Sequence, residues 1–286
     1  MMKRFAILLA ALCMGMGLAA QTRPANVSTR RYKFSDFSDK VTKVVMSGND
    51  MLDSALRQEV LDRWNGSPFE FCTLDEYRQL KTSTQYYFLL AAEGQGKDDH
   101  ETGILFLTLL KGGSETQEGS NAQTEVISLP LAPASGGSGR ELIFLPALVE
   151  GIQDFILKAM ESEKSAYSGL GFFNQGFSRK GHTKRICFSE DDLSPSLSAK
   201  DRERFMDEDM FIREEDEADD LFMAGTYNTL VSYMVAPTEA TSGDLCYKML
   251  IDAGTRKIQY LKKHKISARN GAGFLRDDLR RIARSR

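Results

Sequence analysis

The sequence predicts an α/β (α+β) fold, a single domain in which helices flank one mixed, mostly antiparallel sheet that ends in a C-terminal hairpin and a terminal helix. Short runs rich in β-branched and aromatic residues alternate with segments whose apolar residues recur at helical spacing. Only polar loops separate these segments, and no internal repeat is visible among the residues. We therefore expect one domain over residues 32–286.

The first elements are recognised by their caps. Residues 42–48 predict a strand, and the helix after it has Asn49 as its cap and an apolar stripe that ends near Trp64, which we interpret as a core anchor. A short strand is expected next, over residues 67–72. Thr73 and Glu76 then form the capping box of a short helix.

The middle of the chain is strongly apolar. Residues 84–93 and 103–112 predict an antiparallel strand pair joined by a polar link that contains His100. Another strand is expected over residues 124–133. The longest helix begins at Glu141 and runs to about residue 167, with Pro146 in its first turns, where proline is best tolerated.

The second half begins with a strand at residues 184–189 and continues into an acidic helical insert, residues 189–224, capped in part by Ser198. A further strand is expected near residues 227–237. The basic C-terminal region, residues 244–286, predicts a hairpin with a type I turn at Asp252–Thr255, in which Gly254 is left-handed, and a final helix. On this hairpin we expect one half-buried face and one face that carries lysines to solvent.

The N-terminus is typical of a secretory signal peptide over residues 1–20. Lys3 and Arg4 precede an apolar stretch and a small-residue cleavage site at Ala20, and residues 21–31 form a polar leader. Leu12 stands where lipidation of Cys13 normally requires a small residue, so we expect no acyl chain. The sequence thus predicts an exported, periplasmic or envelope-associated protein with no transmembrane segment.

Cysteines and histidines give no sign of a cofactor. Of the cysteines after the signal peptide, Cys187 and Cys246 lie in expected strands, where they either pair or remain small buried thiols. The three histidines are isolated, no CxxC or calcium loop is present, and no serine nucleophile motif occurs. We therefore expect neither a metal nor a cofactor.

Two segments are candidate binding sites. The first, residues 169–185, places three phenylalanines among glycines and basic residues. Its rings either pack against the sheet or grip a ligand or partner, with basic residues as the rim. The residues concerned are Phe172, Phe173, Phe177, Arg179 and Lys180.

The second candidate is a basic face formed by the end of the hairpin and the final helix. Three partners remain open for it: the chain's own acidic segment, an acidic partner protein, or anionic envelope lipid. Export argues against nucleic acid. The residues of this face are Lys262, Lys263, Lys265, Arg276, Arg280 and Arg281.

Three stretches carry a resemblance to a known group. VTKVVMSGNDMLDSALRQEVLDRW, SPFEFCTLDEY and LIDAGTRKIQY, together with the order of elements, resemble the TolB N-terminal, CsgG and LpoB group of bacterial cell-envelope proteins. The acidic insert and the basic tail depart from that group. The resemblance implies a periplasmic subunit that docks onto partners without catalysis.

These observations favour a non-catalytic, exported adaptor or assembly subunit of the bacterial cell envelope. The alternative is a protein that binds a small ligand or peptide with the loop at residues 169–185. A third hypothesis is a hydrolase with a scattered carboxylate site, because two acids can converge from anywhere in a fold.

Overall fold

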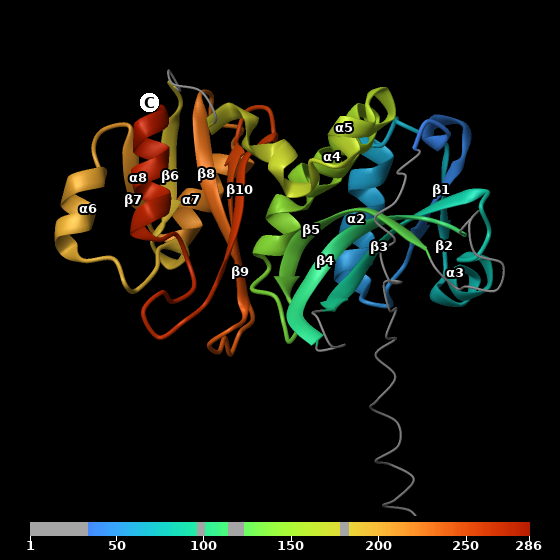
Figure 1. Ribbon diagram of the computed structural model, residues 1–286, viewed down its shortest axis with the longest axis horizontal. Helices are drawn as coiled ribbons and strands as arrows, with labels where there is room; N and C mark the ends of the chain where they lie inside the picture. Colours follow the sequence, from blue (N-terminus) through green and yellow to red (C-terminus); the bar gives the residue numbers. More distant parts are fainter. Residues whose placement is uncertain (1–33, 96–100, 114–122, 178–182) are drawn as a thin grey trace, which may run out of the picture.

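The computed structural model describes residues 34–95, 101–113, 123–177 and 183–286, so the expected signal peptide and leader lie outside it. The α/β class is confirmed, but the strands form two five-stranded mixed sheets where one was expected (Figure 1). Among the described residues, no helix is long and apolar enough to cross a membrane.

The first sheet has the strand order β2-β1-β3-β4-β5. Strand β1 pairs in parallel with both β2 and β3, whereas β4 is antiparallel to both of its neighbours. The strands are β1 (Val41–Val45), β2 (Phe69–Cys72), β3 (Tyr86–Gln95), β4 (Glu101–Lys111) and β5 (Thr124–Pro133).

The second sheet repeats this arrangement in the order β7-β6-β8-β9-β10. Strand β6 is parallel to β7 and β8, and β9 is antiparallel to β8 and β10. The chain therefore contains a repeated topology that its residues do not display. The strands are β6 (Arg185–Ser189), β7 (Met210–Arg213), β8 (Thr229–Val235), β9 (Leu245–Asp252) and β10 (Ile258–Lys265).

The helices share the same repeat. A helix lies between the first two strands of each sheet, another between the second and third, and a last one comes after the fifth strand. In the first half these are α2 (Asp50–Arg63), α3 (Leu74–Leu80) and α4 (Arg140–Glu161); in the second they are α6 (Ala199–Phe205), α7 (Glu215–Met223) and α8 (Arg276–Ser285). Short turns complete the chain: η1 (Phe37–Asp39), α5 (Glu163–Ala166), η3 (Gly169–Phe177) and η4 (Glu190–Asp192).

The predicted caps are confirmed. The side chain of Asn49 accepts from the Leu52 amide at 3.1 Å, and Ser198 accepts from the Asp201 amide at the same distance. Thr73 and Glu76 form the full capping box. Such bonds satisfy amides that have no partner inside the helix, so a few neighbouring residues define each helix start.

Residues 206–213 were expected to continue the acidic helix, and that expectation is wrong. Helix α6 ends at Phe205, and Met210–Arg213 form β7 beside β6. The Asp207 carboxylate accepts from the amides of Asp209 and Met210, which fixes the turn between them. The apolar residues Met210, Phe211 and Ile212 of β7 then pair with β6, most of which is buried.

The C-terminal hairpin forms, but two of its predicted details are wrong. The left-handed residue in the turn is Arg256 (φ 57°) instead of Gly254, and the register shifts between Ile258 and Tyr260. Lys248 is only 1% exposed, so β9 is buried on both faces. A second sheet flanked by helices on both sides leaves no solvent face for this lysine.

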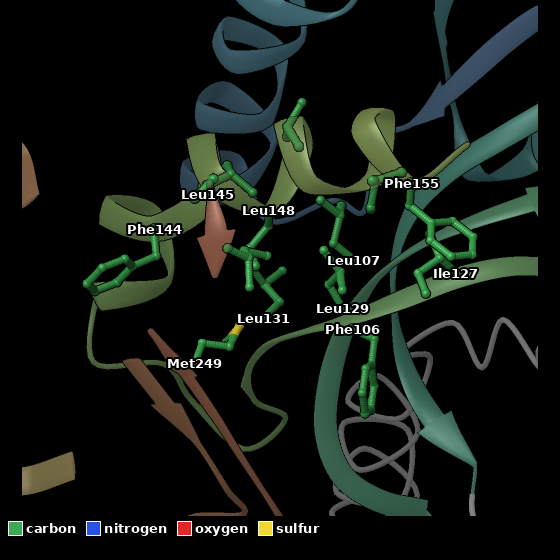
Figure 2. Packing of buried hydrophobic residues seen from close by; sticks show 14 of the residues in the cluster. Phe106, Leu107, Ile127, Leu129, Leu131, Phe144, Leu145, Leu148, Phe155 and Met249 are labelled. Atoms are coloured by element: carbon green, nitrogen blue, oxygen red, sulfur yellow. The ribbon is translucent and has the colours of Figure 1, made fainter. Parts of the chain in front are cut away.

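Helix α4 joins the two halves. It lies between the two sheets in Figure 1, and most of its residues are buried. Figure 2 shows Leu148 of α4 packed in one layer with Leu131 of β5 and Met249 of β9. Phe144 stacks on Tyr233 of β8, with ring centroids 4.4 Å apart. One hydrophobic cluster thus includes residues from both sheets.

Candidate functional site

Open α/β sheets bind ligands outside the carboxyl ends of their parallel strands, so a binding site is expected first at these ends. In the second sheet, β6 ends at Ser189 and leads directly to Asp192 in η4. Neighbouring β7 ends at Arg213 and leads into α7, which carries Asp219. The two acidic side chains converge on Arg140, the first residue of α4.

The Arg140 guanidinium is saturated by partners within the chain. Nε and one terminal nitrogen each donate to the Asp219 carboxylate at 2.9 Å, and the other terminal nitrogen donates to Asp192 at 3.0 Å. Glu215 lies 3.2 Å away, and the Ser232 carbonyl accepts at 3.3 Å. Arg140 therefore has no donor to offer to a ligand.

Asp192 is held just as firmly. Its carboxylate accepts from the Ser232 hydroxyl at 2.6 Å and from the Met234 amide at 3.1 Å, and it is 1% exposed. The Ser232 hydroxyl in turn accepts from the Ser189 amide. Both oxygens of this carboxylate are thus bound to β8 or to Arg140. Asp192 therefore holds the structure together and has no oxygen left for a ligand.

The charges of this cluster do not cancel, because one guanidinium serves three carboxylates. Burial lowers the pKa of Arg140, but Asp192 and Asp219 outweigh burial and raise it above the ordinary value. Burial also raises the pKa of Asp219 and of Glu215, and Arg140 offsets this only in part. The cluster is an ion pair network that joins α4 to the second sheet.

The strand end of the first sheet is filled in a comparable way. After β1 the chain turns through Ser47 and Gly48 into α2, and the Asp53 carboxylate accepts from both of their amides at 2.8 Å. It also accepts from the Ser47 hydroxyl. Backbone amides that could hold an anion are therefore already engaged by an acid of the same chain.

The phenylalanine loop packs inward. Phe173 is 4% exposed, and Phe177 is buried against Tyr260, with ring centroids 5.6 Å apart. Phe172 is half-buried and contacts Phe155 of α4 edge-to-face at 5.5 Å. The Asn174 amide bonds to the backbone of Leu261 and so covers the edge of β10. The predicted rim residues Arg179 and Lys180, like His100, fall outside the described ranges.

The structure does not bring the three hairpin lysines onto one face. Side chains alternate along a strand, so Lys262 lies on the α8 side of β10, opposite Lys248. Lys263 points to the other side, where its ammonium lies 5.8 Å from the centre of the Tyr247 ring. Lys265 is exposed at the end of the strand.

The arginines of α8 divide into two groups. Arg276 pairs with Asp201 at 2.8 Å, and Arg286 pairs with Asp207 at 3.3 Å and with Asp209. These pairs dock the helix onto the acidic segment, one of the three contacts left open by the sequence. The other arginines, Arg280, Arg281 and Arg284, are exposed, and the ion pair of Arg280 among the described residues is with Asp277 of its own helix.

A second buried polar cluster was missed from the sequence. Lys248 of β9 and the Tyr260 hydroxyl of β10 both donate to the Asp278 carboxylate in the first turn of α8. Burial raises the pKa of Tyr260 well above its usual range, and it also raises the pKa of the nearby Cys246 thiol to about 11. The strand periodicity predicted Lys248 at the surface, so no signal pointed to this contact.

The three described cysteines take no part in a disulfide or a metal site. Cys72, Cys187 and Cys246 are free and buried, so the pairing of the last two does not occur. Within the described ranges, no group of three or more His, Cys, Asp or Glu residues could hold a metal ion.

One surface feature was not expected. Tyr227, in the turn between α7 and β8, is 90% exposed, and Met223 at the end of α7 is also exposed. The turn is fixed by the left-handed Gly225 and Asn228 and by a bond from the Thr229 hydroxyl to the Tyr227 carbonyl at 3.1 Å.

No protein family, no curated protein and no solved structure matches this chain.

Proposed function

We propose that this chain is an exported, non-catalytic adaptor or assembly subunit of the bacterial cell envelope that docks onto partner proteins. One observation carries this proposal. An open α/β sheet normally binds its ligand at the carboxyl ends of its parallel strands, but in both sheets a charged side chain of the chain itself bonds to the polar groups there. Asp53 does so in the first sheet and Arg140 in the second.

The outer face of α8 supports an acidic partner. Residues Arg280, Arg281 and Arg284 are exposed on a helix whose other side packs in the core through Leu279 and Ile282. The acidic segment already engages Arg276 and Arg286, so the three outer arginines are the ones available for a contact in trans. Complementary charge would steer such an encounter and make it sensitive to salt.

The test is a pull-down with crosslinking from envelope extracts, with two charge-reversal variants as bait beside the parent. Changing Arg280, Arg281 and Arg284 to Glu should remove the bound partner, whereas changing Lys262, Lys263 and Lys265 to Glu should have a smaller effect. Added salt should weaken the parent's binding. Equal binding of the partner by all three baits would overturn the role of α8. If the chain bound anionic lipid vesicles and no protein, its partner would be a membrane surface.

Export is tested separately by fractionation and intact mass. We expect a mature chain that begins after Ala20 and carries no acyl group. A diacylglyceryl adduct on a cysteine, or retention of the full-length chain in the cytoplasm, would contradict this part of the proposal.

A further inference from the structure

His264 lies near the end of β10, beneath the segment Ser267–Gly273, which leads to α8. Its Nε2 atom is 2.9 Å from the carbonyl oxygen of Gly271. Its Nδ1 atom is buried and has no hydrogen-bond partner in the part of the chain that the structure describes. A carbonyl only accepts, so the ring carries a proton on Nε2, and Nδ1 is the atom that a second proton would occupy.

The surroundings of the ring oppose a second proton. Its neighbour across the sheet is Cys246 of β9, which packs with Ala236 and Ile266 in a small apolar cluster. A proton on Nδ1 would be a buried donor without an acceptor, which costs free energy.

The charged groups that face His264 add to this cost. From β9 comes the buried ammonium of Lys248, and on the same side of β10 lies Lys262. Among the described residues, the acid that acts on the ring is Asp278 of α8, which already accepts from Lys248, from the Tyr260 hydroxyl and from the Leu275 amide. An imidazolium at this half-buried ring would thus be a second cation beside Asp278, whose carboxylate already has three donors.

We propose that His264 is an acid-sensitive latch, which holds Ser267–Gly273 against the second sheet while the ring is neutral and releases this segment when the ring takes up a proton. The inference does not depend on the proposed adaptor role, because it concerns the purified chain alone.

The contacts of the segment define which part is released and which part stays. The bond to Gly271 is broken, together with the contact of the Gly273 amide to the Cys246 sulfur at 3.2 Å. Phe274 stays, because it is fully buried and its amide bonds to the Asp192 carbonyl at 2.7 Å. Since Asp192 also binds Arg140, the latch ends at the residue that joins the two halves.

The direction of the pH effect is set by the neutral ring. Burial, and then Lys248, lower the pKa of His264 below its ordinary value of 6.5, and they outweigh the Gly271 hydrogen bond and Asp278, which raise it. The closed segment is therefore most stable above pH 6.5 and loses stability as the pH falls, because the open form binds the proton more readily. Below pH 6.5 the opening equilibrium rises about tenfold per pH unit until His264 titrates in the closed form.

The first measurement is a histidine titration by NMR on the intact chain, with His264 assigned through the variant His264→Gln. We expect its ring to titrate below pH 6.5 and to be neutral above it, with the proton on Nε2. Titration of His264 at or above pH 6.5 would overturn the proposal without reference to any variant.

The second measurement is hydrogen exchange followed by mass spectrometry at pH 7.5 and pH 5.5, corrected for the intrinsic pH dependence of exchange. Protection of residues 267–273 should fall in the parent as the pH is lowered. In His264→Gln it should not change, because the amide nitrogen can still donate to Gly271 but does not titrate. An equal loss of protection in both chains would show that another group controls the segment.

Discussion

The two halves of the molecule share a strand order but not a size. In the first half, β3, β4 and β5 have 10, 11 and 10 residues and α4 has 22. In the second half, the equivalent strands have 7, 8 and 8 residues and α8 has 10. Helix α4 is covered by a second sheet, whereas α8 ends the repeat and presents arginines to solvent. The same topology therefore places one helix between two sheets and the other at the surface of the described structure.

The halves also hold opposite excess charge in their ion clusters. In the first half, the Asp36 carboxylate accepts from Lys111 at 2.8 Å, from Tyr87 and from Lys40, so one acid serves two cations. In the second half, one guanidinium serves three acids. The first cluster is partly exposed and local to its sheet, whereas the second is buried and joins the halves. The two should therefore differ strongly in their contribution to stability.

Removing the buried cation should have the largest effect. Arg140→Ala leaves Asp192 and Asp219 buried without a counter-ion, so we expect the free energy of unfolding to fall by roughly 3–5 kcal/mol. Urea denaturation measures it. The matched control is Arg63→Ala, which breaks partly exposed pairs with Glu59 and Glu150 inside the first half and should cost about 1 kcal/mol or less. Similar losses in both variants would remove the distinction between the clusters.

The phenylalanine loop should behave as core. Phe173→Ala should cost roughly 3 kcal/mol or more, and Phe172→Ala less, because Phe172 is only half-buried. The readouts are urea denaturation and the envelope pull-down described above. A variant that carries both Phe172→Ala and Phe173→Ala is the deciding case. If it kept its stability and lost its partner, the loop would be the docking site and α8 would not.

The cluster of the first half predicts a loss of stability in acid. Burial raises the pKa of Asp36, but hydrogen bonds from Lys111, Lys40 and Tyr87 outweigh it and lower the pKa from 3.8 to about 2. A lowered carboxyl pKa contributes stability that is present above pH 4 and is lost as the pH falls toward 2. Since the site is partly exposed, we expect about 1 kcal/mol. Thermal unfolding between pH 2 and 5 should show this loss in the parent and in Asp39→Asn, but not in Asp36→Asn.

The smallest expected difference concerns two equivalent junctions. Helix α3 begins with the Thr73 capping box after β2, whereas Glu214, the N-cap residue of α7 after β7, makes no side-chain cap. Thr73→Ala should cost about 1 kcal/mol, and Glu214→Ala close to none. Urea denaturation of both variants measures the loss in free energy of unfolding. Equal losses would mean that the capping box adds no stability beyond the helix propensity of the residue.

Local signals explain the elements that the sequence could predict. Caps at Asn49, Thr73 and Ser198 lie within three residues of the groups that they bind, so both partners stand together in the sequence. The expected strands were recovered for the same reason, since alternation and β-branching are properties of a few neighbouring residues. The short strand β7 was not predicted, because the residues on both sides of it are acidic and favour a helix.

Long-range contacts explain the features that the sequence could not predict. Arg140 meets Asp192, Asp219 and Ser232 at separations of 52, 79 and 92 residues, and no spacing rule links such positions. The repeat was hidden because strand order was kept while lengths and residues changed. Lys248 was placed on the surface because a hairpin alone does not reveal that α8 covers its second face.

The shared helix also sets the order in which the molecule can be completed during synthesis. Helix α4 leaves the ribosome before β8 and β9 exist, so the partners of Phe144 and Arg140 are not yet available. The surface of α4 that these partners cover therefore stays uncovered until the second sheet has been made.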